Sequence, residues 1–330
     1  MYGGSFMRRV IPLLCSLLLL CSCGAGPSAS APEDSSRLVI FTARSAAVYD
    51  DAVREFERRT GSWVEVRTAD GTLPLLEQIA AGSSGCDLLL GAAPDSLSAY
   101  GDCFAPYTAP LAADIPDAYR DSEDRWTPFS LLPTVLIYND QLVQRNVPDS
   151  WADLVSVAWR GRIACPDPTV SATGCTALQA LLQVLPGEEE AVLTAFSRNL
   201  SGVLPSAAAV ADAVADGSCY VGVTTEDLAL QAADSGLSIT VVYPAEGAIV
   251  QSDCAAIVRD CAHEDNARAF IDFLLSSEVQ TRLARQLRRP IRGDADAALP
   301  PVLSYDPYGA GAHQAELLAI WRSLTAEDAA

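Results

Sequence analysis

Short apolar segments alternate with amphipathic helical segments from residue 37 onward. Residues 38–41 and 86–90 are apolar runs of strand length, and residues 63–66 alternate apolar and polar side chains as a half-buried strand does. Between them, residues 49–59 and 73–81 place apolar side chains at helical spacing. This order is typical of a parallel sheet covered by helices, so it predicts an α/β fold.

A second block of the same kind follows, with predicted strands at residues 162–165, 220–223 and 239–243 and predicted helices at residues 174–184, 207–215 and 226–233. Residues 134–138 are expected to form an extended connector between the blocks, and residues 255–258 a strand that returns to the first. Two lobes joined by two crossings leave a cleft between them. We assign residues 37–134 and 250–310 to lobe 1, residues 135–249 to lobe 2, and residues 311–330 to a C-terminal helix whose lobe the pattern does not determine.

Hydroxyl and glycine residues follow the predicted strands at the points where helices begin. Ligands of such sheets bind at the carboxyl ends of the strands, and a helix N-terminus offers unpaired N–H groups that favour anions. The alternative is ordinary helix capping, for which Ser and Thr are well suited. Four such loops at one cleft favour a binding site. Its candidate residues are Thr42, Arg44, Ser45, Gly71, Thr72, Ser171, Thr173, Thr224, Thr225 and Glu226.

We expect these groups to bind a small anion that also carries hydroxyl groups or an amine. Arg44 would add a charge-assisted hydrogen bond to the anion, and Glu226 would accept a hydrogen bond from an ammonium or hydroxyl group. A cationic ligand such as a polyamine is the alternative, because the formal net charge of the chain is -20. That charge is spread over the whole chain, whereas the hydroxyl groups are local to the loops, so we rank the anion first.

The N-terminus has the layout of a secretory signal peptide. Arg8 and Arg9 precede an apolar run over residues 10–20, and small residues and cysteines follow. Residues 20–24, LCSCG, resemble a bacterial lipobox, in which Cys23 is the lipidated cysteine. We therefore predict a signal peptide over residues 1–22, a lipidated tether over residues 23–36, and anchoring on the extracytoplasmic face of the cell membrane. An ordinary cleaved signal peptide is the alternative.

Composition excludes several classes of function. The chain has 42 acidic residues and 22 basic ones, none of which is lysine, so neither nucleic-acid binding nor a Walker A motif is expected. The sequence contains no GxSxG, no HExxH and, after Cys23, no CxxC. We expect no enzyme activity, no cofactor and no metal centre.

Trp126 is the tryptophan best placed to face a ligand. A helix is expected to end near Arg285, Arg288 and Arg289, because positive charges are favourable at a helix C-terminus. The alternative is that these arginines form an exposed basic patch that contacts a partner.

Several segments, taken in order and spacing, resemble the bacterial extracellular solute-binding proteins of the ferric-iron, phosphonate and sugar-phosphate group. The resemblance implies the type II periplasmic-binding-protein fold and a monomer that delivers a small solute to the permease of an ABC importer. Ferric-binding members carry adjacent tyrosines where this chain has residues 224–227, TTED, so a phosphonate or sugar phosphate fits better than iron. An enzyme on the same fold is the alternative from another class. The segments are residues 41–45, 56–61, 86–91, 138–139, 148–154, 159–163, 166–174 and 267–276.

The cysteines agree with export, because disulfides form in oxidising compartments. Seven cysteines follow Cys23, and an odd number leaves at least one unpaired. In the fold that the resemblance implies, the strand over residues 255–258 lies beside the strand over residues 88–90. This neighbourhood implies a Cys86–Cys261 bridge, with Cys165–Cys175 as a competing pair.

Overall fold

The computed structural model describes residues 34–69, 71–82, 85–293 and 299–327. The predicted signal peptide, Cys23 and the tether as far as residue 33 lie outside these residues. Residues 34–36 form a short 3-10 helix that leads into the first strand. None of the helices in the described ranges combines the length and the apolarity that crossing a bilayer requires.

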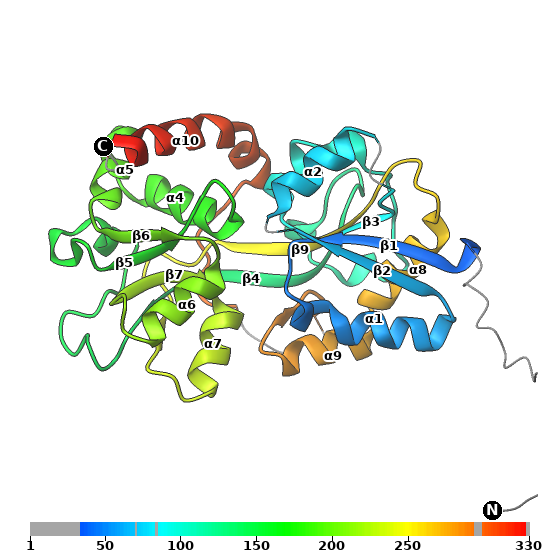
Figure 1. The fold of residues 1–330 in the computed structure, drawn as a ribbon, viewed down its shortest axis with the longest axis horizontal. Helices are drawn as coiled ribbons and strands as arrows, with labels where there is room; N and C mark the ends of the chain where they lie inside the picture. Colours follow the sequence, from blue (N-terminus) through cyan, green and yellow to red (C-terminus); the bar gives the residue numbers. More distant parts are fainter. Residues whose placement is uncertain (1–33, 70, 83–84, 294–298, 328–330) are drawn as a thin grey trace, which may run out of the picture. The chain divides into compact units, whose positions relative to one another are not determined.

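The first lobe contains a mixed sheet with helices on both faces (Figure 1). Leu38 and Ile40 of the first strand face one apolar core with α1, α8 and α9, and Val39 and Phe41 face another with α2, as the two-residue period of a strand requires. The strands are β1 (Arg37–Thr42), β2 (Trp63–Thr68), β3 (Leu88–Ala92) and β9 (Val250–Ile257). The helices are α1 (Ala46–Thr60), α2 (Thr72–Ala80), α3 (Pro94–Ser98), α8 (Glu264–Leu274) and α9 (Ser277–Arg285).

The second lobe repeats this arrangement. Leu136 packs in the core beneath α4 and α5, whereas its neighbours Val135 and Ile137 pack in the core beneath α6 and α7. The strands of this lobe are β5 (Ile163–Pro166), β6 (Leu200–Leu204), β7 (Val221–Thr225) and β8 (Thr240–Val242). The helices are α4 (Ala172–Val184), α5 (Glu189–Ser197), α6 (Ala207–Ala215) and α7 (Glu226–Asp234).

Two long strands join the lobes (Figure 1). The longer is β4 (Thr127–Tyr138), whose first half pairs with β9 and whose second half pairs with β7 and β8. The other crossing leads into β9, because Ile249 packs in the core of the second lobe and Val250 in that of the first. Two extended crossings are the arrangement expected from the sequence.

The chain ends in α10 (Pro307–Glu327), which touches both lobes. Its Leu317 and Trp321 are buried in the core beneath α4 and α5. At its other end Gly311 lies against α3, where an added Cβ would stand 2.5 Å from the carbonyl oxygen of Asp95. The short strand β10 (Arg289–Pro290) pairs with β4. Short 3-10 helices cover Gly101–Cys103, Ala112–Asp114, Asp117–Tyr119, Ala152–Val155 and Val157–Trp159.

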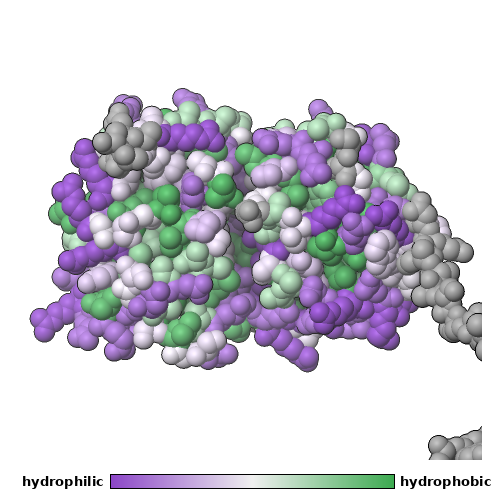
Figure 2. Space-filling model, viewed as in Figure 1, coloured by the Kyte–Doolittle hydropathy of each residue, from purple (hydrophilic) through white to green (hydrophobic). Residues whose placement is uncertain are grey.

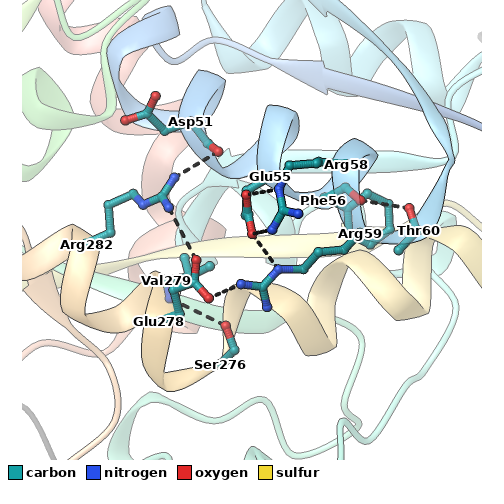
Figure 3. A network of polar contacts seen from close by, with 10 residues as sticks. All are labelled: Asp51, Glu55, Phe56, Arg58, Arg59, Thr60, Ser276, Glu278, Val279 and Arg282. Carbon is teal, nitrogen blue, oxygen red and sulfur yellow. Dashed lines mark hydrogen bonds and ion pairs between the residues drawn. The ribbon is translucent and has the colours of Figure 1, made fainter.

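An ion-pair network fixes α1 against α9 (Figure 3). Glu55 accepts hydrogen bonds from Arg58 and Arg59, which lower the pKa of its carboxyl group to about 2. Arg59 also pairs with Glu278, and Arg282 donates to the carbonyl oxygen of Asp51 at 2.9 Å. The network holds together the two helices whose ends lead to the site described below.

The expected disulfides are not formed among the seven cysteines of the described residues. The thiol of Cys86 donates to the carbonyl oxygen of Leu88 at 3.3 Å, and the thiol of Cys175 donates to that of Pro168 at 3.0 Å. Burial raises the pKa of the Cys175 thiol to about 12. These thiols are therefore protonated hydrogen-bond donors at neutral pH.

Candidate functional site

A cavity of about 670 Å³ is lined by residues of both lobes. Figure 2 shows the furrow between the lobes on one face of the molecule. The first residues of α1, α2, α4, α6 and α7 line the cavity, because each helix follows a strand or loop that ends at this edge of the two sheets. The lining residues on these helix starts are Arg44, Ser45, Ala46, Gly71, Thr72, Ser171, Ala172, Thr173, Ser206, Ala207, Ala208 and Thr225.

Helix starts give this cavity an excess of hydrogen-bond donors. The first N–H groups of an α-helix have no partner within the helix, and the helix dipole adds a partial positive charge at that end. Two of the five helices are long, α1 with 15 residues and α4 with 13. Five such ends around one space make it a favourable place for negative charge.

Capping explains one of the three serines at these helix starts. Ser206 accepts a hydrogen bond from the backbone N–H of Ala209 at 3.1 Å, so its side chain caps α6. Ser45 and Ser171 occupy the same position on α1 and α4, but neither side chain makes a capping hydrogen bond. Their hydroxyl groups are therefore available to a bound molecule.

A buried arginine forms part of the cavity wall. The side chain of Arg288 is 3% exposed, its Nε donates to Oδ2 of Asp227 at 3.1 Å, and its Nη2 lies 2.9 Å from Oδ2 of Asp253. Burial disfavours the charged guanidinium, but the two carboxylates outweigh burial and raise the pKa of Arg288. Within the described part of the chain, Nη1 of Arg288 has no hydrogen-bond partner.

The carboxylates near the cavity are already paired with cations or hydroxyl groups. Asp253 is fully buried between Arg288 and Arg44, and Arg44 also donates to the carbonyl oxygen of Gly91 at 3.0 Å. Asp227 accepts a second hydrogen bond from Thr225 at 2.5 Å. Two arginines thus balance two aspartates beside the cavity.

Seven of the ten predicted site residues line this cavity: Arg44, Ser45, Gly71, Thr72, Ser171, Thr173 and Thr225. The structure brings together the loops of both lobes that the sequence singles out.

The other three predicted site residues do not line the cavity and have structural roles. Thr42 is buried, and its hydroxyl oxygen accepts a hydrogen bond from the backbone N–H of Arg44 at 3.0 Å. Thr224 is buried and donates to the carbonyl oxygen of Ala207 at 2.8 Å. Thr42 is the last residue of β1 and Thr224 is the second to last residue of β7, and both side chains are buried inside their lobes.

Glu226 also lies away from the cavity. It is 1% exposed and accepts hydrogen bonds from Arg289 at 2.8 Å and from the hydroxyl group of Tyr243. It is therefore not placed to meet an amine of a ligand. Trp126 does not face the cavity either, because it is buried in the first lobe beside Tyr308.

The sequence interpretation missed Arg288, Ser206 and Tyr49 as lining residues. Arg288 was expected at a helix C-terminus or in an exposed patch. The helix α9 ends at Arg285, and Leu287 then takes a left-handed conformation with φ of 60°. This turn carries Arg288 inward, and a pattern of charges alone does not reveal it.

The donor set does not resemble an iron site. Among the described residues, no group of three His, Cys, Asp or Glu side chains is arranged to hold a metal ion. Among the described lining residues, Tyr49 is the one tyrosine that could offer a phenolate to iron. The carboxylate of Asp227 already accepts hydrogen bonds from Arg288 and Thr225.

Comparison with solved structures defines the class of fold. The periplasmic binding protein AfuA of Actinobacillus pleuropneumoniae, with fructose 6-phosphate bound, matches 86% of this chain and 97% of its own, with a TM-score of 0.78 and 22% identity. Iron-bound HitA of Pseudomonas aeruginosa matches 87% of this chain and 99% of its own, with a TM-score of 0.76 and 22% identity. The fold is thus the two-lobed fold of the periplasmic binding proteins, as the sequence resemblance implied.

The family follows from the sequence match. A model of the bacterial extracellular solute-binding proteins matches residues 99–310, and the chain belongs to this family. The phosphoglycerate transport regulatory protein PgtC of Salmonella typhimurium is 27% identical over 261 residues, which are 76% of this chain and 64% of PgtC. A second Salmonella typhimurium protein, named as a 2-aminoethylphosphonate-binding periplasmic protein, is 24% identical over 59% of this chain and 63% of its own. This chain therefore spans less than two thirds of the length of these relatives.

Proposed function

We propose that this protein binds a small organic anion of the phosphonate or sugar-phosphate type in the cavity between its lobes. One observation carries the proposal: a buried arginine with an unpartnered Nη1 stands in the wall of a cavity that five helix N-termini also line. A guanidinium group and helix N–H groups are the donors that phosphate and phosphonate oxygens prefer.

The relatives support the same class of solute. The printed names of two Salmonella proteins refer to phosphoglycerate and 2-aminoethylphosphonate, and a structural neighbour holds fructose 6-phosphate. These three compounds share a phosphate or phosphonate group on a small carbon skeleton. Because their identities to this chain are low, they indicate a class of solute and not a particular compound.

The size of the cavity favours an organic anion over an inorganic one. Its volume of about 670 Å³ lies within the range of roughly 300–1,000 Å³ that is usual for small-molecule sites. Thr72, Ser171 and Thr173 line the same cavity as Arg288 and could pair with hydroxyl groups of the skeleton. Since Asp227 and Asp253 are already paired with Arg288, the cavity favours a hydroxylated anion over a polyamine.

A thermal-shift screen of the mature chain tests the proposal. A ligand that binds the folded state alone raises its stability by about 2.7 kcal/mol at a hundredfold excess over its dissociation constant. Sugar phosphates and phosphonates are expected to raise the melting temperature, and their dephosphorylated counterparts are not. A shift with spermidine or ferric citrate and none with the organic anions would contradict the proposal.

We further propose that the protein delivers its solute to the permease of an ABC importer as a lipid-anchored monomer and performs no turnover. The family match and the absence of an uncommitted carboxylate at the described cavity wall support this view. Cys23→Ala is expected to release the protein from the membrane fraction of its host. Fractionation of the variant with membranes, as for the wild type, would contradict the lipid anchor.

A further inference from the structure

We propose that Gly71 determines how far the two lobes close on the solute, because it is where the backbone of the first lobe meets that of the second. This inference rests on the proposed function, since closure matters only for a protein that binds a solute between its lobes. Gly71 precedes α2 in the first lobe, and Val170 precedes α4 in the second. Both residues line the cavity.

The two backbones come unusually close. A Cβ atom added to Gly71 would stand 3.0 Å from the carbonyl oxygen of Val170 and 3.9 Å from its carbonyl carbon. The carbonyl carbon is at an ordinary contact distance, but the separation of 3.0 Å from the oxygen is tighter than that of nine in ten real Cβ contacts. A Cβ atom at position 71 would therefore require the Val170 carbonyl group to move by a few tenths of an ångström, and a larger side chain would require more.

Backbone conformation does not require glycine at this position. Gly71 has φ of -163° and ψ of 162°, which is extended backbone that any residue adopts. Gly91 differs, because its φ of 82° lies in the left-handed region. The absence of a side chain at Gly71 serves the close approach of Val170 and not a turn.

The contact is of a kind that can open and close. No backbone hydrogen bond among the described residues joins Gly71 to Val170, and the Val170 side chain is 47% exposed. Separation of the two residues leaves the buried cores of both lobes unchanged. The Arg288–Asp227 pair, by contrast, is a buried polar link between the lobes. The Arg288–Asp227 ion pair thus links the lobes at the cavity wall, and the contact between Gly71 and Val170 adds a steric limit that the residue at position 71 controls.

Substitutions of graded size at position 71 provide the test. Gly71→Ala and Gly71→Val are expected to weaken binding of fructose 6-phosphate and 3-phosphoglycerate, by roughly 5- to 150-fold, with the larger loss for valine. Thermal unfolding of the ligand-free variants should stay close to that of the wild type. The matched control is Gly202→Ala in β6, where an added Cβ has no atom within 4 Å, and it should bind as the wild type does.

Small-angle X-ray scattering separates this inference from the proposed function. Ligand-free Gly71→Val should have a larger radius of gyration than the wild type, whichever solute the protein binds. If the wild type binds neither probe but the variant is expanded, the proposed function is wrong in its solute class and the role of Gly71 stands. Unchanged scattering together with wild-type affinity in Gly71→Val would overturn the role of Gly71.

Discussion

Arg288 of the first lobe donates a hydrogen bond from Nε to Oδ2 of Asp227 in the second lobe, at 3.1 Å. Both side chains are buried, and the same arginine also pairs with Asp253 of β9. A buried charge of this kind is costly unless it is paired. The pair therefore joins the lobes, and among the described residues Nη1 of the arginine has no hydrogen-bond partner.

Arg288 and its neighbour Arg289 make a matched pair for mutation. Arg288→Gln leaves Asp227 and Asp253 buried without their cation and should lower the free energy of unfolding by roughly 3–5 kcal/mol. It should also abolish binding of the phosphorylated or phosphonate solute that the wild type binds. Arg289→Gln likewise deprives buried Glu226 of its guanidinium, but Arg289 does not line the cavity, so binding should persist. Urea unfolding and calorimetry measure the two effects.

A second variant covers the case in which Arg288→Gln does not fold. Arg288→Lys keeps the positive charge and lacks the second nitrogen of the guanidinium fork. The folded variant should bind the solute about ten- to 150-fold more weakly, the cost of one hydrogen bond to a charged group. Wild-type affinity in Arg288→Lys would show that the guanidinium does not contact the solute.

Ser171 and Ser276 separate binding from helix capping. Both are N-cap residues, but only Ser276 makes a capping hydrogen bond, to the N–H of Val279 (Figure 3). Ser171→Ala should weaken solute binding about ten- to 150-fold with little change in stability. Ser276→Ala should lower the free energy of unfolding by about 1 kcal/mol and leave affinity unchanged. The reverse pattern would assign Ser171 to the fold and not to the site.

Glu226 is expected to contribute to stability and not to recognition of an amine. Because it is paired with Arg289 and Tyr243, Glu226→Gln should change the affinities for 2-aminoethylphosphonate and for a hydroxylated phosphate by similar factors. Calorimetry with both compounds provides the comparison. A loss confined to 2-aminoethylphosphonate would place the carboxylate in contact with the amine.

The raised pKa of Tyr243 leads us to expect a loss of folding stability at alkaline pH. Burial, together with the hydrogen bond to Glu226, raises the pKa of its phenol to about 12, whereas an unfolded chain has a pKa near 10. The folded state therefore holds this proton more tightly, so the contribution is fully present below pH 10 and is lost as the pH rises through 12. Urea unfolding at pH 9 and pH 11 should show a smaller loss of stability in Tyr243→Phe than in the wild type. Equal losses would contradict this link.

The strand and helix pattern could be predicted where one side chain period dominates, as in β1 and α1. The first half of β4 could not, because Pro128 and Pro133 argue against a central strand. The structure accommodates Pro128 next to an irregularity in the pairing with β9. The polar start of β9, with buried Gln251 and Asp253, also hides a strand that apolar runs would have revealed.

The loops of the site could be predicted because hydroxyl residues at helix starts are visible in the sequence. The ion pairs behind them could not, since Arg288 and Asp227 lie 61 residues apart and meet only through the fold. The same limit explains why Glu226 was wrongly predicted to contact the ligand, since its partner Arg289 belongs to the other lobe. The charged residues that the sequence suggested were helix-end or surface features form ion pairs with residues far away in the chain.

The most direct test of the central claim is a calorimetric titration of the mature chain with fructose 6-phosphate, 3-phosphoglycerate and 2-aminoethylphosphonate, each beside its counterpart without the phosphorus group. The account predicts saturable binding of one solute per chain for at least one of the three, and no heat of binding for its counterpart. Tight binding of a polyamine or of ferric citrate, with no response to any organic anion, would contradict it.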